Sequence, residues 1–530
     1  MAVAGGLLLA AAFPKIGLAG FAWLAPGVML MAAIGRSGAA AFRIGYVAGL
    51  AFYLAALYWL LLIPLAFTPI VGWLSLGIYL ALYPGVWVWL CWKTYPAPAC
   101  ESSGWAPLLD WFVAPSWPRR LGWTLFCAML WVALEMIIGR LFTGFPWNFV
   151  GASQYRILPI IQIASVTGVY GISFLVVWFS VSLASAFAML IRRPQVRWHA
   201  QRELLAPLLV GAAVAALGWH DLMQPAPRQP ALKAVLVQPS IPQTWIWDSD
   251  ASSNRFQQLL QLTEQALTNH PDLLVWPEAA VPYMLRFDEN IYSAVTNLVQ
   301  RHKVWLVLGS DDGEVDPQPD GRTQTNYFNS SFLVRPDGEI MASYRKRNLV
   351  IFGEYIPFGR RFAWIERFTG MGSFARGDRP GFFSIPELRA KASVLICFED
   401  VFPHLTRASV QDDTDFVLNL TNNGWFDESA AQWQHAANAV FRAVENRIPL
   451  VRCANNGLTC WVDEHGRMND VLFAADRRIY GIGFETIEVP LLGGHNRTPT
   501  FYHRHGDWFG WGCVGLSAAI LLWRLIRHKS

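Results

Sequence analysis

Charged residues are scarce in this chain of 530 residues. Asp, Glu, Lys and Arg together account for only 15% of the sequence, whereas 54% is hydrophobic and the mean hydropathy is +0.29. This balance excludes an entirely soluble protein and favours a membrane protein. The long apolar runs fall almost entirely within residues 1–220 and 507–530, while 231–500 has the pattern of a soluble α/β domain. We therefore predict a membrane domain with seven transmembrane helices over 1–220, a soluble domain over 221–506, and a final transmembrane helix with a basic tail over 507–530.

Cysteine is also scarce. The seven cysteines show no disulfide ladder, no CxxC pair and no Cys/His spacing typical of a metal site. Cys453 and Cys460 are close enough in sequence to pair across a hairpin in an oxidising compartment, which would leave Cys397 as the odd thiol of the soluble domain. No run of Lys and Arg with interleaved aromatic residues is present, so the net charge of +4 does not indicate nucleic-acid binding.

Eight apolar runs approach the length of about 20 residues that a transmembrane helix needs. They cover residues 3–18, 19–35, 44–67, 70–92, 121–139, 158–190, 204–219 and 507–525. Only the break FPKIGLAG separates the first two, which form either a tight hairpin or one broken helix. A signal peptide is the alternative for the first run, but no basic segment precedes it and further spans follow, so we expect an uncleaved helix. The run 158–190 exceeds one span, and we expect an interfacial lead-in before the helix.

Basic residues in the short loops predict the orientation in the membrane. They are Arg36, Arg43, Lys93, Arg119, Arg120, the arginines within 192–202 and those of the C-terminal tail. With eight spans, all of these segments and both termini lie on one side, which the positive-inside rule makes cytoplasmic. The soluble domain 221–506 is then expected on the opposite side, next to the membrane surface.

Short apolar strands alternate with helices in the soluble domain. Expected strands include LKAVLVQPS (232–240), DLLVWPE (272–278), VWLVLGS (304–310), ASVLICFED (392–400) and DFVLNLTNNGWF (415–426), with helices over 251–268, 289–302 and 430–447. The turns PDG and EHG add antiparallel pairs. This pattern predicts a layered α/β fold in which helices cover one face of a sheet, rather than a fully parallel doubly wound sheet.

Three polar segments directly follow predicted strands, where α/β proteins place their catalytic groups. They contribute Glu278 in VWPEAAVP, Lys346 and Glu354 in SYRKRNLVIFGEYIPFG, and Cys397 and Glu399 in ICFED. Taken singly, each is more often structural: a loop carboxylate, a surface lysine or a buried cysteine. Taken together, they supply a thiol nucleophile, a carboxylate that can accept its proton and a cation that can stabilise an oxyanion.

The same motifs point to a known family. VWPE, YRKRNLV-FGEYIPF and LICFED resemble the Glu-Lys-Cys motifs of the nitrilase superfamily. AAFPKIGLAGFAWLAP, WVALEMIIGRLFTGFPWNFVGASQ, GVYGISFLV, VQPSIPQTWIWD and NLTNNGWFDESAAQWQHAANAVFRAVENRIPLVRCANNG resemble the apolipoprotein N-acyltransferases, which are membrane-embedded members of that superfamily. The resemblance extends over essentially the whole chain, in order. It implies a nitrilase-like αββα domain outside the cytoplasm, carried by an α-helical membrane domain of about eight spans.

The resemblance also implies roles for individual residues. Cys397 becomes the nucleophile that accepts the acyl group, Glu278 the general base and Lys346 the oxyanion stabiliser. The supporting positions are Glu354, Glu399 and Asn329, and the expected substrate or lid residues are Trp147, Trp247, Phe398 and Tyr355. The segment 359–374, which mixes Arg with Phe and Trp, suits an interfacial lid, although an ordinary surface helix is the alternative.

Two positions depart from the family pattern. Ile351 stands where the family usually has Pro, and Phe398 stands where it usually has Tyr. The first is expected to change the stiffness of the loop before Glu354, and the second removes a hydroxyl near the substrate. Neither change affects the three catalytic positions, so we expect altered substrate handling and not a loss of activity.

The implied reaction moves an acyl chain from a phospholipid, through a cysteine thioester, to the N-terminal amine of a diacylglyceryl-cysteine apolipoprotein. It implies no cofactor or metal, a monomer in the bacterial inner membrane, and a catalytic domain on the periplasmic side. A membrane-anchored amidohydrolase, in which water resolves the acyl-enzyme, is the main alternative; a transporter or scaffold with a degenerate enzyme domain is the other. Glu135, inside a predicted span, is either functional or a structural hydrogen-bond partner between helices.

Overall fold

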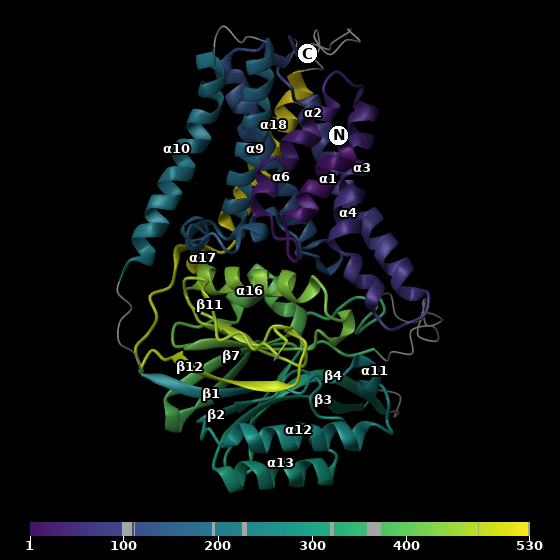
Figure 1. The fold of residues 1–530 in the computed structure, drawn as a ribbon, viewed down its shortest axis with the longest axis vertical. Coiled ribbons are helices and arrows are strands. Elements are labelled where there is room, and N and C mark those ends of the chain that lie inside the picture. Colours follow the sequence, from purple (N-terminus) through teal and green to yellow (C-terminus); the bar gives the residue numbers. More distant parts are fainter. Residues whose placement is uncertain are drawn as a thin grey trace. The chain divides into compact units, whose positions relative to one another are not determined.

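The computed structural model describes residues 1–97, 109–110, 112–192, 197–224, 230–317, 323–357, 373–474 and 476–527. These residues form two compact units (Figure 1). The first comprises Met1–Leu61, Pro69–Gln224 and Phe501–Ser530, and the second Leu62–Thr68 and Pro225–Thr500.

Six helices of the first unit are long and apolar enough to cross a membrane, counted over the described residues. They are α3 (Gly38–Ala56), α4 (Thr68–Lys93), α6 (Trp117–Ile138), α9 (Val169–Arg192), α10 (Arg197–Leu222) and α18 (Trp508–Arg527). The run 158–190 is divided as expected, because α7 (Leu158–Ile161) and α8 (Ala164–Thr167) precede α9 and Gly168 separates them from it.

The predicted count of about eight spans is not confirmed, because the first two candidate runs fold into short helices. α1 (Ala2–Ala11) has ten residues and α2 (Ala25–Ala33) has nine, so each is about 15 Å long or less and falls short of a hydrocarbon core of about 30 Å. The chain between them contains Pro14, which lacks the N–H of a continuing helix, and Gly17 in a left-handed conformation (φ +71°). The two short helices pack against each other, since a Cβ atom on Gly5 of α1 would lie 3.0 Å from the side chain of Met29 in α2. The tight-hairpin interpretation of this region is therefore the one observed.

Small residues bring the first helices into close contact. A Cβ atom on Gly6 of α1 would lie 2.1 Å from the carbonyl oxygen of Ala48 in α3. A Cβ atom on Gly45 of α3 would likewise lie 2.4 Å from the carbonyl oxygen of Pro84 in α4. Only glycine permits these backbone approaches, which is the usual way in which helices pack in a membrane.

The second unit contains two six-stranded mixed sheets. The first has the order β12-β1-β2-β3-β4-β5 and the second β11-β10-β9-β8-β7-β6. The strands are β1 (Ala231–Gln238), β2 (Leu273–Val275), β3 (Trp305–Pro317), β4 (Thr323–Val334), β5 (Ile340–Arg345), β6 (Gly381–Ile385), β7 (Ala390–Ile396), β8 (Phe416–Thr421), β9 (Leu450–Ala454), β10 (Cys460–Val462), β11 (Met468–Asn469) and β12 (Gly483–Pro490). Strands β1, β2 and β3 pair in parallel, as do β7, β8 and β9, and the outer strands pair antiparallel.

Both faces of the first sheet are buried, and the side chains alternate between two cores. Leu236 of β1 packs into a core shared with the second sheet, where it joins residues such as Leu418 of β8. Val235, the neighbour of Leu236, packs instead against α12 (Ser252–Leu267) and α13 (Glu289–His302). This alternation follows from the two-residue period of a strand.

Helices α12 and α13 cover the outer face of the first sheet, and α16 (Ala431–Asn446) covers the second (Figure 1). Sequence determines where α13 begins and ends: the Asp288 carboxylate accepts a hydrogen bond from Ile291 N at 2.9 Å, and Lys303 ends the helix in a left-handed conformation. The second unit is thus an αββα sandwich, which confirms the fold implied by the resemblance. Strands β6 and β12 were not predicted.

Candidate active site

Cys397 is the first residue after β7 and lies, half-buried, on a turn. It starts the 3-10 helix Cys397–Val401 and has a positive φ of +52°, a conformation that a residue other than glycine adopts only when its surroundings impose it. Its carbonyl oxygen accepts a hydrogen bond from Asn419 Nδ2 at 3.0 Å and lies 3.2 Å from His435 Nε2. These two side chains, from β8 and α16, hold the strained turn in place.

Lys346 follows β5 and lies in a buried cluster of polar groups. Its Nζ atom is 2.8 Å from Glu354 Oε1 and 3.3 Å from Glu278 Oε1, and only 1% of the residue is exposed. Asn329 of β4 donates from Nδ2 to both carboxylates, at 2.8 Å to Glu278 and 2.9 Å to Glu354. The structure therefore brings together four residues that are separate in the sequence: Glu278, Lys346 and Glu354, expected from segments that follow strands, and Asn329, which lies within β4 and was expected from the family resemblance.

Main-chain donors fix both carboxylates. Glu278, three residues beyond the end of β2, accepts a hydrogen bond on Oε2 from Asn422 N at 2.8 Å. Glu354 accepts one on Oε2 from Val350 N, also at 2.8 Å. Each carboxylate thus keeps one oxygen for the cluster around Lys346 and has the other bound to backbone.

The charges of this cluster act on Lys346 and on the Cys397 thiol. Burial on its own lowers the pKa of Lys346, but the negative charges of Glu278 and Glu354 outweigh it and hold this pKa well above its ordinary value. Burial, followed by the charge of Glu278, raises the pKa of Cys397 to about 12, against the opposing charge of Lys346. At neutral pH the site therefore holds a protonated thiol and a lysine ammonium, so the thiol needs a base at the moment it attacks.

Glu399 connects the cysteine turn to the lysine loop. Its buried carboxylate accepts hydrogen bonds from Ile396 N at 2.8 Å, next to the cysteine, and from Arg347 N at 2.7 Å, next to the lysine. It also accepts from Asn348 N at 3.0 Å and from the Tyr344 hydroxyl at 2.9 and 2.8 Å. Burial raises the pKa of Glu399 although these donors oppose it. The supporting carboxylate positions the two segments relative to each other.

A buried ionic group behind the cysteine turn was missed by the sequence analysis. Asp400 makes an ion pair with Arg452, and its Oδ1 lies 2.7 Å from His435 Nε2. Burial acts to raise the pKa of Asp400, but Arg452 and His435 outweigh it and lower the pKa. The polar run NLTNN (419–423) ends β8 and extends two residues past it. This run was the sequence signal from which the neighbouring Asn419 and Asn422 could have been found.

The expected substrate or lid residues occupy different surroundings. Trp147 lies in the first unit, 3% exposed, with its ring 5.1 Å from that of Trp59. In the second unit, Trp247 is 41% exposed and its ring is 5.2 Å from that of Trp425. Phe398 and Tyr355 are half-buried.

Phe398, beside the nucleophile, packs edge-on against Phe402 at 5.0 Å, and Arg376 lies 4.9 Å above the ring of Tyr355. Ile351, at the other departure from the family pattern, forms an isolated bridge to Tyr355. Most of the proposed lid 359–374 lies outside the described residues.

The remaining cysteines of the second unit are not bridged. Cys453 and Cys460 are both free and buried, so the pairing considered for them is not present. Among the described residues, no group of three or more His, Cys, Asp or Glu side chains is arranged to hold a metal ion.

Comparison with known proteins places this site in a family. A family model described as carbon-nitrogen hydrolase matches residues 233–475, and one described as the apolipoprotein N-acyltransferase N-terminal domain matches residues 5–182. The apolipoprotein N-acyltransferase of Geobacter metallireducens is 34% identical over 541 residues, which cover 100% of this chain and 95% of the relative. The chain belongs to the apolipoprotein N-acyltransferase family.

Other members of the apolipoprotein N-acyltransferase family match at similar length. The one from Vibrio vulnificus is 28% identical and covers 99% of this chain and 96% of its own length. A solved amidase of the nitrilase superfamily, from Nesterenkonia, is 18% identical, covers 51% of this chain and 95% of its own, and has a TM-score of 0.36. Membership of the apolipoprotein N-acyltransferase family, together with the six apolar helices, makes the chain a bacterial membrane protein.

Proposed function

We propose that the protein transfers an acyl chain from a phospholipid to the N-terminal amine of a diacylglyceryl-cysteine apolipoprotein, through a thioester on Cys397. The observation that carries the proposal is the buried cluster of Glu278, Lys346, Glu354 and Asn329, whose charges act on a cysteine in a strained turn. The membership of the acyltransferase family supplies the substrate class.

In the first half-reaction, the sulfur of Cys397 attacks the carbonyl carbon of the phospholipid ester while Glu278 takes the thiol proton. Because the pKa of the thiol is raised to about 12, proton transfer accompanies attack and does not precede it. The ammonium of Lys346 stabilises the tetrahedral oxyanion. The carbon–oxygen bond then breaks, and Glu278 returns the proton to the departing lysophospholipid.

In the second half-reaction, the free amine of the apolipoprotein attacks the thioester carbonyl and gives its proton to Glu278. The carbon–sulfur bond breaks, an amide forms, and the thiol regains its proton. A thioester suits this task because it reacts with amines. Glu354 and Asn329 are positioning residues in this scheme, since they hold the lysine and the base and need not touch substrate.

We also propose that the domain 221–506 lies on the periplasmic side, with both termini in the cytoplasm. If the six long helices from α3 onward cross the membrane in turn, one side carries Arg36 and Arg43, Lys93 with Arg119 and Arg120, the arginines after α9 and the C-terminal tail. That arrangement follows the positive-inside rule whether or not α1 and α2 add spans.

The fate of the acyl chain tests the proposal. Full-length protein in detergent would receive phospholipid labelled in its acyl chains and a diacylglyceryl-cysteine peptide with a free or an acetylated N-terminus. We expect label on the free-amine peptide only, and none with Cys397→Ala. Label released as free fatty acid at the same rate with either peptide would instead identify a hydrolase.

A further inference from the structure

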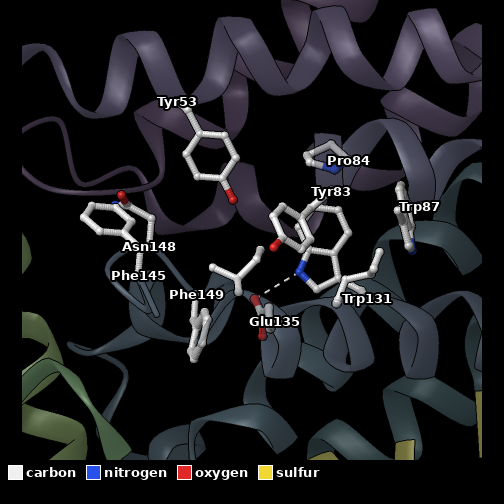
Figure 2. A pocket seen from close by; sticks show the side chains of 11 residues that line it. Tyr53, Tyr83, Pro84, Trp87, Trp131, Glu135, Phe145, Asn148 and Phe149 are labelled. Atoms are coloured by element: carbon white, nitrogen blue, oxygen red, sulfur yellow. Dashed lines mark hydrogen bonds between the residues drawn. The ribbon is translucent and has the colours of Figure 1, made fainter. Parts of the chain in front are cut away.

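A small cavity lies between helices of the first unit, apart from the residues of the candidate active site (Figure 2). It encloses about 20 Å³ of free space, which holds roughly one water-sized group. Its lining includes Tyr53 of α3, Tyr83 and Trp87 of α4, and Trp131 and Glu135 of α6. The loop after α6 completes the lining with Phe145, Asn148 and Phe149.

Polar groups in the cavity have unused hydrogen-bonding capacity. Glu135 is 4% exposed, and its Oε1 accepts from Trp131 Nε1 at 3.0 Å and from Val150 N at 2.8 Å. Its other oxygen, Oε2, is buried and makes no hydrogen bond of normal geometry within the described part of the chain, although the Ser173 side chain lies beside the carboxyl group. Asn148 is 6% exposed, and neither its amide nitrogen nor its amide oxygen has a partner there. Figure 2 shows the hydroxyl of Tyr53 directed toward the space beside Glu135.

Among the described residues, Glu135 lacks a counter-ion. No ion pair joins this carboxylate to a Lys, Arg or His among the residues that the structure describes. A buried carboxylate without a counter-ion is costly in a membrane helix, and such residues usually mark a binding site or pathway. The aromatic rings of Trp87, Trp131 and Phe149 surround the same space, and aromatic faces attract cations. An acidic group within an aromatic cage is suited to an ammonium ion.

Size and position narrow the choice of cation. A primary ammonium group is about as large as a water molecule and fits the free space, whereas a trimethylammonium group is several times larger and does not. Glu135 lies in the last turn of α6 (Trp117–Ile138), and Tyr53 lies in the last turn of α3 (Gly38–Ala56). These two residues place part of the lining near the ends of α3 and α6, toward the level of lipid headgroups, whereas Tyr83 and Trp87 lie in the second half of α4 (Thr68–Lys93).

We propose that this cavity binds the primary ammonium group of a lipid, with Glu135 as its counter-ion and Asn148 and Tyr53 as hydrogen-bond acceptors. Two substrates of the proposed function carry this group: a phospholipid with an aminoethyl headgroup, and the apolipoprotein with its free α-amine. In naming these sources the inference rests on the proposed function. Binding of the ammonium does not require Cys397, so the two ideas fail separately.

Binding of defined lipids to the full-length Cys397→Ala protein tests the inference without turnover. Native mass spectrometry in detergent would compare phosphatidylethanolamine with phosphatidylcholine and phosphatidylglycerol of the same acyl chains. A second arm would compare a diacylglyceryl-cysteine peptide with its N-acetylated form. In one of the two arms, we expect the ligand with a primary amine to bind about tenfold more tightly than the corresponding ligand without one. The arm that shows this preference identifies which substrate supplies the ammonium group.

Variants of the cavity connect the preference to Glu135. Glu135→Gln is expected to remove the tenfold preference for the primary-amine ligand and to leave phosphatidylglycerol binding unchanged. Asn148→Asp adds a negative charge and is expected to increase that preference. Glu387→Gln, on the exposed surface of the other unit, is the matched control. If Glu135→Gln does not fold, Tyr53→Phe provides the test, with an expected loss of about threefold in preference. Equal binding of ligands with and without a primary amine by the unmodified cavity would overturn the inference. So would a preference for the primary amine that survives both Glu135→Gln and Tyr53→Phe.

Discussion

Replacing Glu399 by Gln tests how the cysteine turn is positioned. The carboxylate is fully buried and accepts hydrogen bonds from Tyr344, Ile396, Arg347 and Asn348. An amide of the same shape offers one acceptor oxygen, so its NH₂ group must face a main-chain N–H on one side or the other. The substitution loses one buried hydrogen bond to a charged group, worth about 2 kcal/mol, and leaves a donor unsatisfied at a cost of about 1 kcal/mol or more.

These two costs add to about 3 kcal/mol. If this energy appears as misplacement of Cys397 relative to Lys346, it corresponds to roughly a hundredfold decrease in the acylation rate. Single-turnover kinetics with a fluorescent phospholipid measure acylation directly. We expect Glu399→Gln to slow acylation about a hundredfold while the acyl group still becomes attached to Cys397. The iodoacetamide reactivity of Cys397 in the same variant reports whether the turn has moved.

Glu387→Gln is the matched control for this substitution, because Glu387 is exposed and makes no hydrogen bond to the site. It should leave both the acylation rate and thermal stability unchanged. An unchanged acylation rate in Glu399→Gln would refute the reasoning, since the four donors would then not need the carboxylate.

Three further predictions concern charge and thiols. Asp400→Asn leaves the buried guanidinium of Arg452 without its counter-ion, so the free energy of unfolding, measured by thermal or chemical unfolding, should fall by about 3–5 kcal/mol. A decrease below about 1 kcal/mol would contradict the role of the ion pair. Because burial raises the pKa of Cys397 to about 12, thiolate is the minor form throughout pH 7–9.5, and the alkylation rate of Cys397 should rise about tenfold per pH unit across that range; a plateau near pH 9 would show an ordinary thiol. Cys453 and Cys460 are free and buried, so both should resist alkylation in the native protein and react after unfolding without reductant, and labelling that requires reductant would reveal a disulfide.

Much of the active site could be predicted because strand ends in an α/β fold gather at one edge of a sheet. Glu278 and Cys397 each follow an apolar run that is visible in the sequence, Lys346 follows the second strand of the pair joined by the PDG turn, and the structure gathers their surroundings into one site. The roles of Glu354 and Asn329 came from family resemblance. Neither spacing nor composition indicated that a single amide, Asn329 Nδ2, donates to both carboxylates.

Other features depend on contacts that a single sequence does not encode locally. β6 and β12 are edge strands. Their pairing with β7 and β1 is decided by tertiary packing, and neither has a strong strand signal of its own. Hydropathy predicted two spans over 3–35, where Pro14 and Gly17 instead divide the chain into short helices. The support of the Cys397 carbonyl by His435 depends on a helix 38 residues away, which no motif spacing reveals.

The intact mass of the protein after incubation with phospholipid alone tests the central claim, that Cys397 carries the acyl group. The account predicts a mass increase equal to one acyl chain, absent in Cys397→Ala, located on the peptide that contains Cys397, and removed when a diacylglyceryl-cysteine peptide with a free amine is added. No acyl adduct on the unmodified protein, or the same adduct on Cys397→Ala, would contradict it.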